Sequence, residues 1–269
     1  MRILFFTDVL GAGGKERRLT ELMKSLESMQ DISFELVLMH KEIHYKEVLD
    51  LGIDIHYILR KTKKDPLVLY KLFKHCKEYK PDILHCWDSM TAVYSVPVCK
   101  LLNIKLVNGM ITNSLTRQSI FNNYWLRAKL TFPFSDYIVG NSYSGLKSYK
   151  APGKKSMVIY NGFDFKRINS IMPADIIRKQ LDIRTRYLIG MVASFSENKD
   201  YRTYFNSACS ILNKRKDVTF LAIGNDTDSA DLKKLIKDEF KEHFRLLGRK
   251  SGIESFINAM DICILSTFT

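Results

Sequence analysis

The sequence of 269 residues predicts an α/β protein with two domains, each a parallel β-sheet doubly wound with helices. Short apolar runs alternate with stretches whose apolar residues recur at helical spacing, which is typical of strand–helix–strand units. A polar segment at about residues 161–186 interrupts this alternation, and we interpret it as a hinge. We therefore expect residues 1–165 and 166–269 to form the two domains.

The first domain is predicted to contain seven strands joined mainly by helices. The series begins with an apolar run at residues 3–6 that stops at Thr7-Asp8. The first helix is predicted because Leu19, Leu22 and Leu26 recur every three or four residues. The expected strands are residues 2–7, 34–40, 54–58, 82–86, 105–110, 137–139 and 157–160, and the expected helices are residues 17–29, 67–79 and 89–102.

The second domain repeats the pattern with fewer elements. We expect strands at residues 187–193, 218–223, 244–247 and 261–265, and helices at 201–215, at 229–240 and from 251. Four strands are few for a doubly wound sheet, and the sequence stops four residues after the last one. Ligands of such sheets bind beyond the carboxyl ends of the strands. We therefore expect the second domain to be incomplete at its ligand-binding edge.

The composition is that of an ordinary globular chain, with 46% hydrophobic and 26% charged residues, which excludes a disordered or collagen-like protein. The formal net charge is +13, and both predicted domains are basic. Such a field favours anionic partners, namely nucleotide phosphates, acidic lipid surfaces or nucleic acid. The alternative is that the lysines and arginines only solvate the surface.

The five cysteines are scattered without a C-x-x-C pair, which favours reduced thiols over a disulfide frame or a zinc site. The first apolar run is too short for a signal peptide, and no run approaches the about 18 residues of a membrane span. We expect a soluble cytoplasmic protein that can associate with the inner face of the cell membrane.

A glycine-rich turn, Gly11-Ala12-Gly13-Gly14, comes after the first strand and opens a helix. Glycines there let backbone N–H groups approach a phosphate or a sugar, and the helix N-terminus favours negative charge. A nicotinamide fingerprint is excluded because Glu16 stands where its third glycine would be. The turn could also serve packing alone.

Two cationic or polar side chains stand where strands end. Lys199 lies between a strand and a helix, where it can meet a diphosphate or remain a solvated lysine. His85 ends a strand and is either a site residue or a packed core histidine. Asn161-Gly162 suits a positive-φ turn, which Asp164 can cap or bridge.

Metal-binding patterns are weak. Asp226 and Asp228 could hold a divalent ion, but turn and helix-cap roles are favoured. His40 and His44 are four residues apart without the glutamate of H-E-x-x-H, so a zinc site is disfavoured.

Taken in order along the chain, these signals resemble the motifs of glycosyltransferase family 4. Gly13-Gly14-Lys15-Glu16-Arg17 is similar to that family's G-G-x-E-R after the first strand. The other matching segments are residues 81–85 (P-D-[IV]-[IV]-H), 136–142, 158–164 (I-x-N-G-[VF]-D), 192–199 (V-G-R-L-x-x-x-K), 220–224, 248–249 and 259–265.

The resemblance implies a GT-B fold, with two Rossmann-like domains and a retaining transfer from a nucleotide sugar. It implies no metal and no cofactor besides the donor, no nucleic acid, and a glycan acceptor that is lipid-linked, in surface polysaccharide biosynthesis. The residues it assigns are Lys199 and His85 for catalysis; Gly13, Gly14, Ser194, Lys199, Gly224, Arg249 and Lys250 for the donor and its phosphates; Glu16 and Arg17 on the acceptor side; and Asn161, Gly162 and Asp164 for the hinge.

The sequence departs from the family pattern at four places. Ser194 replaces a phosphate-binding arginine, Trp87 replaces the second histidine of H-x-H, and residues 106–112 lack a histidine. The sequence also ends before the E-x7-E segment that contacts the donor. These departures leave open a non-catalytic nucleotide-sugar-binding protein or an inactive remnant. A nucleic-acid binder and a metal-dependent GT-A transferase that uses Asp226 and Asp228 are further alternatives.

Overall fold

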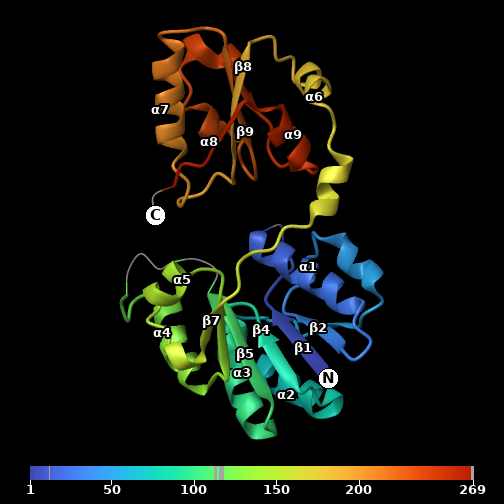
Figure 1. Cartoon of the computed structure of the whole chain (residues 1–269). Coiled ribbons are helices and arrows are strands. Elements are labelled where there is room, and N and C mark those ends of the chain that lie inside the picture. The colour runs from blue at the N-terminus through green and yellow to red at the C-terminus, as the bar shows by residue number, and fades with distance from the viewer. Residues whose placement is uncertain (12, 112–113, 115–117, 268–269) are drawn as a thin grey trace. The chain divides into compact units, whose positions relative to one another are not determined.

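The computed structural model describes residues 1–11, 13–111, 114 and 118–267 (Figure 1). The chain divides into two compact units, Met1–Phe163 and Asp164–Thr269, two residues before the expected boundary. Ala12 of the glycine-rich turn and Thr112 of the histidine-free segment lie outside the described residues.

The described residues of the first unit form one sheet of seven parallel strands in the order β3-β2-β1-β4-β5-β6-β7. All seven predicted strands are present, with ends shifted by at most two residues. Their bounds are β1 (Arg2–Thr7), β2 (Ser33–Leu38), β3 (Ile55–Tyr57), β4 (Ile83–Cys86), β5 (Lys105–Ile111), β6 (Tyr137–Gly140) and β7 (Ser156–Val158).

Helices cover both faces of this sheet because neighbouring side chains of a strand point to opposite faces. In β1, Phe5 packs in the core beneath α1 (Gly14–Glu27), whereas Leu4 and Phe6 belong to the core beneath α2 (Pro66–Tyr79) and α3 (Ser89–Leu102). Two further helices were not predicted, because their sequences carry too few buried residues for a clear pattern: α4 (Asn123–Thr131) and α5 (Tyr143–Ser148).

Side-chain caps fix where α2 and α3 begin. Asp65 accepts a hydrogen bond from the Leu67 N–H, and Pro66 occupies the first helical turn. Asp88 accepts from the Met90 and Thr91 N–H groups and completes a capping box with Thr91. The start of α3, directly after β4, therefore depends on a carboxylate held at the end of the strand.

Up to Thr267, where the described part of the second unit ends, four parallel strands lie in the order β10-β9-β8-β11. The strands are β8 (Tyr187–Val192), β9 (Val218–Ile223), β10 (Phe244–Leu246) and β11 (Ile262–Ile264). The α-helices are α6 (Ala174–Gln180), α7 (Tyr201–Leu212), α8 (Ala230–Lys233) and α9 (Ile253–Ala259). The prediction of a second doubly wound parallel sheet is confirmed.

The predicted hinge at residues 161–186 is wrong for most of its length. Residues Phe165–Ser170 form a 3₁₀ helix, and α6 begins directly after Pro173. Ile177 of α6 is completely buried in one core with Leu188 and Ala259. The segment therefore belongs to the second unit, and its polarity reflects a short helix with a narrow apolar side.

The helix predicted at residues 229–240 is interrupted. Leu232, Ile236 and Phe240 are all buried at a spacing of four, as the pattern requires. However, α8 ends at Lys233, Lys237 is extended, and a 3₁₀ helix covers Asp238–His243. The apolar spacing correctly identifies the buried side chains but does not require the helix to be continuous.

Strand β11 differs from the other strands of its sheet. It pairs with β8 alone in the described part of the chain, and Ile262 is 52% exposed. Strands of parallel sheets are normally covered on both faces, so this strand is unusually accessible.

Candidate functional site

The strand order places a crevice at the carboxyl edge of the first sheet. Strands β1 and β4 are neighbours, and the chain proceeds from them in opposite directions across the sheet. Ligands of doubly wound sheets bind at such a point of reversal. Gly13 and Gly14 come after β1, and His85 belongs to β4, so the structure brings these predicted residues to one region.

The first turn of helix α1 lies close to the glycine-rich turn that precedes it. Gly13 precedes α1 in an extended conformation, and Glu16 lies in the first turn. A Cβ atom on Gly13 would lie only 2.3 Å from Glu16 Oε2, while Lys15 Nζ lies 3.1 Å from Glu16 Oε1. A side chain at position 13 would therefore displace the Glu16 carboxylate from the turn. Lys15, which was not predicted, lies here beside the predicted Gly13 and Glu16.

His85 lines a largely apolar pocket of about 390 Å³. Its ring packs against Phe5 and Trp87, with ring centroids 5.6 and 4.9 Å away. Gly109 leaves room for it, since a Cβ there would lie 3.1 Å from His85 Nε2. Further apolar side chains around this pocket are Leu22, Ile111, Val139, Ile159 and Tyr160.

Burial lowers the pKa of His85 to about 3, so its imidazole is neutral at physiological pH. A neutral imidazole offers one N–H donor and one acceptor nitrogen. It can therefore orient a hydroxyl group by hydrogen bonding, but it does not supply a proton as an imidazolium.

This pKa predicts a pH-dependent stability. In the unfolded chain a histidine titrates near a pKa of about 6.5, so between that pH and about 3 only the unfolded state binds the proton. The stabilisation from neutral His85 is therefore present above about pH 6.5 and is lost as the pH falls. We expect the free energy of unfolding, wild type minus His85→Gln, to shrink by about 2 to 3 kcal/mol between pH 6.5 and 4.5.

Urea denaturation at each pH measures this difference. A constant difference would show that His85 titrates normally, and an NMR titration of its ring in the wild type decides the point if the variant does not fold.

A second, more polar pocket of about 500 Å³ shares Arg18, Trp87, Asn141 and Asn161 with the first. Arg18 donates to Asn161 Oδ1 at 2.6 Å and to the Gly14 carbonyl oxygen at 3.1 Å. Arg18 therefore stands where the apolar and polar pockets meet. Gly13, Gly14, Lys15 and Glu16 line the polar pocket.

Arg18 was not among the predicted residues, because the motif selected Arg17. The Arg17 guanidinium lies 5.1 Å from the centroid of the Tyr45 ring, and Arg17 lines neither pocket. Helical spacing could have identified Arg18 from the sequence. Residues 18, 21, 22 and 25 form one stripe of α1, and all four line the apolar pocket.

The three predicted hinge residues are divided between the units. Asn161 and Gly162 line the apolar pocket of the first unit. Asp164 belongs to the second unit, where its carboxylate accepts from the Lys166 N–H at 2.9 Å and caps a 3₁₀ helix.

The second unit gathers its predicted residues on loops after three adjacent strands. Ser194 and Lys199 come after β8, Gly224 after β9, and Arg249 and Lys250 after β10. Parallel strands place these loops along one edge of the sheet.

Backbone contacts fix the Lys199 loop. Lys199 forms an isolated antiparallel bridge with Thr267, and Thr267 Oγ1 donates to the Asn198 carbonyl oxygen at 2.9 Å. Asp200 then caps α7 by accepting from the Thr203 N–H. The position of the Lys199 backbone is therefore defined on both sides.

Gly224 allows the loops after β8 and β9 to touch. Its φ is +152°, and a Cβ atom there would lie 2.1 Å from the Ala193 carbonyl oxygen. The Gly224 N–H donates to the Gly248 carbonyl oxygen at 2.9 Å. This hydrogen bond connects the loop after β9 to the loop after β10. Ser194, Arg249 and Lys250 are all exposed around this contact, so the edge can present cations and backbone N–H groups to an anion.

Asp226 and Asp228 have turn roles, as their sequence context favoured. Asp226 has a φ of +60°. Asp228 lies against Gly248, where a Cβ would be 2.6 Å from its Oδ2. Neither residue takes part in a cluster of three metal-ligand side chains within the described residues.

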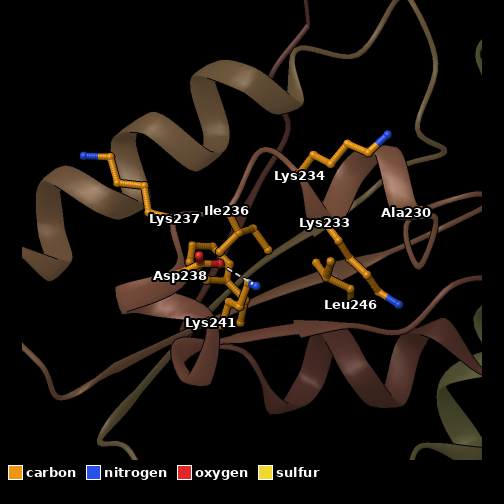
Figure 2. Close-up of a pocket in the computed structure, with 9 residues that line it drawn as sticks. Ala230, Lys233, Lys234, Ile236, Lys237, Asp238, Lys241 and Leu246 are labelled. Atoms are coloured by element: carbon orange, nitrogen blue, oxygen red, sulfur yellow. Dashed lines mark ion pairs between the residues drawn. The ribbon is translucent and has the colours of Figure 1, made fainter.

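A further hollow of the second unit, about 790 Å³, lies away from these loops. Figure 2 shows it between the α8 region and β10, with Lys233, Lys234 and Lys237 reaching outward in different directions and Lys241 paired with Asp238 at 2.5 Å. These lysines do not converge on one point, and none of the predicted site residues lines the hollow.

Known proteins resemble this chain in both sequence and fold. A family model described as Glycosyltransferase Family 4 matches residues 12–167, more than half of the chain. No curated protein matches the chain.

Several solved structures share its fold. Alr3699/HepE from Anabaena in complex with UDP-glucose has a TM-score of 0.81 and 17% identity, covering 100% of this chain and 74% of that one. A glycosyltransferase from Rickettsia africae has a TM-score of 0.75 and 17% identity, over 99% and 73%. The lipopolysaccharide outer core galactosyltransferase WaaB, in its apo form, has a TM-score of 0.69 and 16% identity, over 99% and 74%.

Proposed function

We propose that this chain, which belongs to glycosyltransferase family 4, transfers a sugar from a nucleotide-sugar donor to a lipid-linked glycan acceptor in surface polysaccharide biosynthesis. Its two parallel sheets match the GT-B architecture of the transferases above. The observation that carries the acceptor assignment is the pair of adjoining pockets in the first unit. One is apolar and the other polar, with Arg18 between them, which suits an acceptor with an apolar chain and a diphosphate.

The donor is assigned to the loop edge of the second unit. Lys199, Arg249 and Lys250 supply positive charge there. The close contact at Gly224 holds the backbone of the loop after β9 against that of the loop after β8. A UDP-sugar is the first donor to test, because HepE is described with UDP and with UDP-glucose.

The mechanism we propose is charge stabilisation at the leaving group. As the bond from the anomeric carbon to the diphosphate breaks, negative charge builds on the diphosphate, and Lys199 and backbone N–H groups offset it. Family membership supports retention of configuration and a reaction that needs no metal. Neutral His85 would orient a hydroxyl group of the bound sugar or acceptor.

A comparison of neighbouring arginines tests the acceptor site. Arg18→Ala is expected to raise the KM for a polyprenyl-diphosphate acceptor by about tenfold or more, because a charge-assisted contact to the diphosphate is lost. Arg17→Ala is the matched control and should change this KM by less than about twofold. Transfer from radiolabelled UDP-sugars to detergent-solubilised acceptor measures both values.

Recovery of most of the affinity in Arg18→Lys would support a charge contact. Equal effects of Arg17→Ala and Arg18→Ala would argue against the assigned pockets.

We also propose that α4 and the residues just before it contact an anionic membrane. Within the described residues, no helix has both the length and the apolar character needed to cross a bilayer. Phe121 is 91% exposed, and Leu126 and Leu130 lie one turn apart on the exposed side of α4. Lys129 Nζ lies 4.1 Å from the centroid of the Trp125 ring, so cationic and aromatic groups adjoin these apolar side chains. This combination is typical of interfacial helices.

Vesicle binding tests this surface. The double variant Phe121→Ser, Leu130→Ser is expected to bind vesicles containing phosphatidylglycerol at least about tenfold more weakly, because apolar area no longer enters the bilayer. Leu101→Ser at the end of α3, where Leu101 is 74% exposed, is the control and should bind like the wild type. Loss of binding in the control, or equal binding of all three proteins, would refute the assignment of α4.

A further inference from the structure

Two histidines and a glutamate meet on the first sheet, away from the pockets described above. Glu35 belongs to β2, His56 to β3 and His75 to α2. Along β2, Leu36 and Leu38 pack beneath α1, so Glu35 points to the opposite face, beneath α2. His85 packs on Phe5, which belongs to the α1 face. The cluster and the apolar pocket are therefore on opposite faces of the sheet.

The three side chains converge on one point. His75 Nε2 lies 2.9 Å and His56 Nε2 3.2 Å from the same oxygen, Glu35 Oε2. One ligand atom from each residue lies within 4.8 Å of the others. Ligands of a tetrahedral zinc ion are about 3.4 Å apart, given bonds of about 2.0 to 2.1 Å. The spacing of this cluster is close to that of a metal site.

Three buried polar atoms face one another in this cluster. Both ring nitrogens, His56 Nε2 and His75 Nε2, contact the same carboxylate oxygen, Glu35 Oε2. Beyond these mutual contacts, none of the three atoms has a hydrogen-bond partner among the described residues. Buried polar groups are almost always paired, and one cation would pair with all three atoms at once.

Charged and aromatic groups surround the cluster. Burial and the proximity of His56 lower the pKa of His75, and Glu35 raises it. The nearby charges are mixed: Glu78 also acts on His75, and the Arg2 guanidinium lies 5.9 Å from the Tyr79 ring, which stacks on His75. The side chain of His56 is 41% exposed, which leaves a route from solvent.

We propose that Glu35, His56 and His75 bind one divalent transition-metal ion, with Zn²⁺ preferred because two imidazoles and one carboxylate suit it. Water would occupy the fourth position. The ion would fasten the edge strand β3 and helix α2 to β2. It would be separate from the transfer reaction, so the expectation that transfer needs no metal is unaffected.

Zinc binding to the full chain, freed of metal by chelator and dialysis, tests this site. Isothermal titration with ZnCl₂ should show one equivalent per chain, with affinity that falls as the pH drops and the histidines are protonated. His56→Gln and His75→Gln should each weaken binding by at least about tenfold. His44→Gln is the matched control, because His44 also lies beside a glutamate, Glu42, but with one imidazole only, and it should bind zinc like the wild type.

X-ray absorption of the zinc-loaded wild type decides the ligands without any variant. Two imidazoles with oxygen and without sulfur are expected. Sulfur ligation, absence of ordered imidazoles, a stoichiometry near zero, or equal affinity in His56→Gln, His75→Gln and His44→Gln would each overturn the proposal. None of these measurements depends on sugar transfer.

Discussion

Replacement of Lys199 by alanine is expected to lower kcat/KM for sugar transfer by tenfold or more, a loss of about 1.4 kcal/mol of transition-state stabilisation or above. The reason is electrostatic, since in the proposed mechanism a cation at the carboxyl edge of β8 offsets the charge that grows on the leaving diphosphate. Ser194 stands where the family pattern has an arginine, so fewer cations share this role. The backbone bridge to Thr267 fixes the Lys199 loop at this edge. We therefore expect that, in Lys199→Ala, the loop does not move so that another cation replaces the lysine.

Three variants separate this effect from a general loss of charge. Lys199→Arg keeps the charge and should retain more activity than Lys199→Ala. Lys233→Ala removes an exposed lysine from the other hollow and should leave kcat/KM unchanged. UDP affinity from calorimetry gives a readout independent of turnover, and unchanged kinetics and UDP affinity in Lys199→Ala would refute its role.

Gly224→Ala is expected to destabilise the second unit by about 3 kcal/mol or more. The new methyl group would lie 2.1 Å from the Ala193 carbonyl oxygen and 2.8 Å from the Ser194 backbone nitrogen. Both neighbours are backbone atoms, so neither can turn aside as a side chain would. The φ of +152° adds strain for any residue with a Cβ.

Gly190→Ala in β8 provides the matched comparison in the same unit. Its Cβ would approach the Met260 side chain, whose flexible thioether can move. Urea denaturation should therefore show a clearly smaller loss for Gly190→Ala than for Gly224→Ala. The reverse order would contradict the close approach of the two loops.

The sequence predicted the strands well because their signal is local. A short apolar run bounded by polar residues defines a buried parallel strand, and β1, β4 and β9 lie within one residue of the prediction. The prediction failed for a helix that buries very few of its side chains. Helix α6 has one fully buried residue, Ile177, which cannot produce a visible stripe, so the segment looked like a linker.

The candidate sites show the same limit. Gly13, Gly224 and His85 could be selected individually because each stands at or after the end of a strand. The choice of Arg17 over Arg18 depended on side-chain direction, which the motif does not contain.

The Glu35–His56–His75 cluster was not predicted, because it comes from three elements with no short spacing. His40 and His44 have the four-residue spacing of a metal motif, but they do not contact the same carboxylate. His40 lies beside Asp8, and His44 lies beside Glu42.

The accessibility of β11 affects how the protein behaves as its concentration rises. Within the described residues β11 is an apolar strand that is paired on one side only, and such a strand can add the same strand of a second molecule by backbone hydrogen bonding. The average molecular mass in solution should therefore increase with protein concentration. Ligand titrations that vary the protein would then mix ligand binding with self-association, whereas titrations at one low protein concentration would report ligand binding alone.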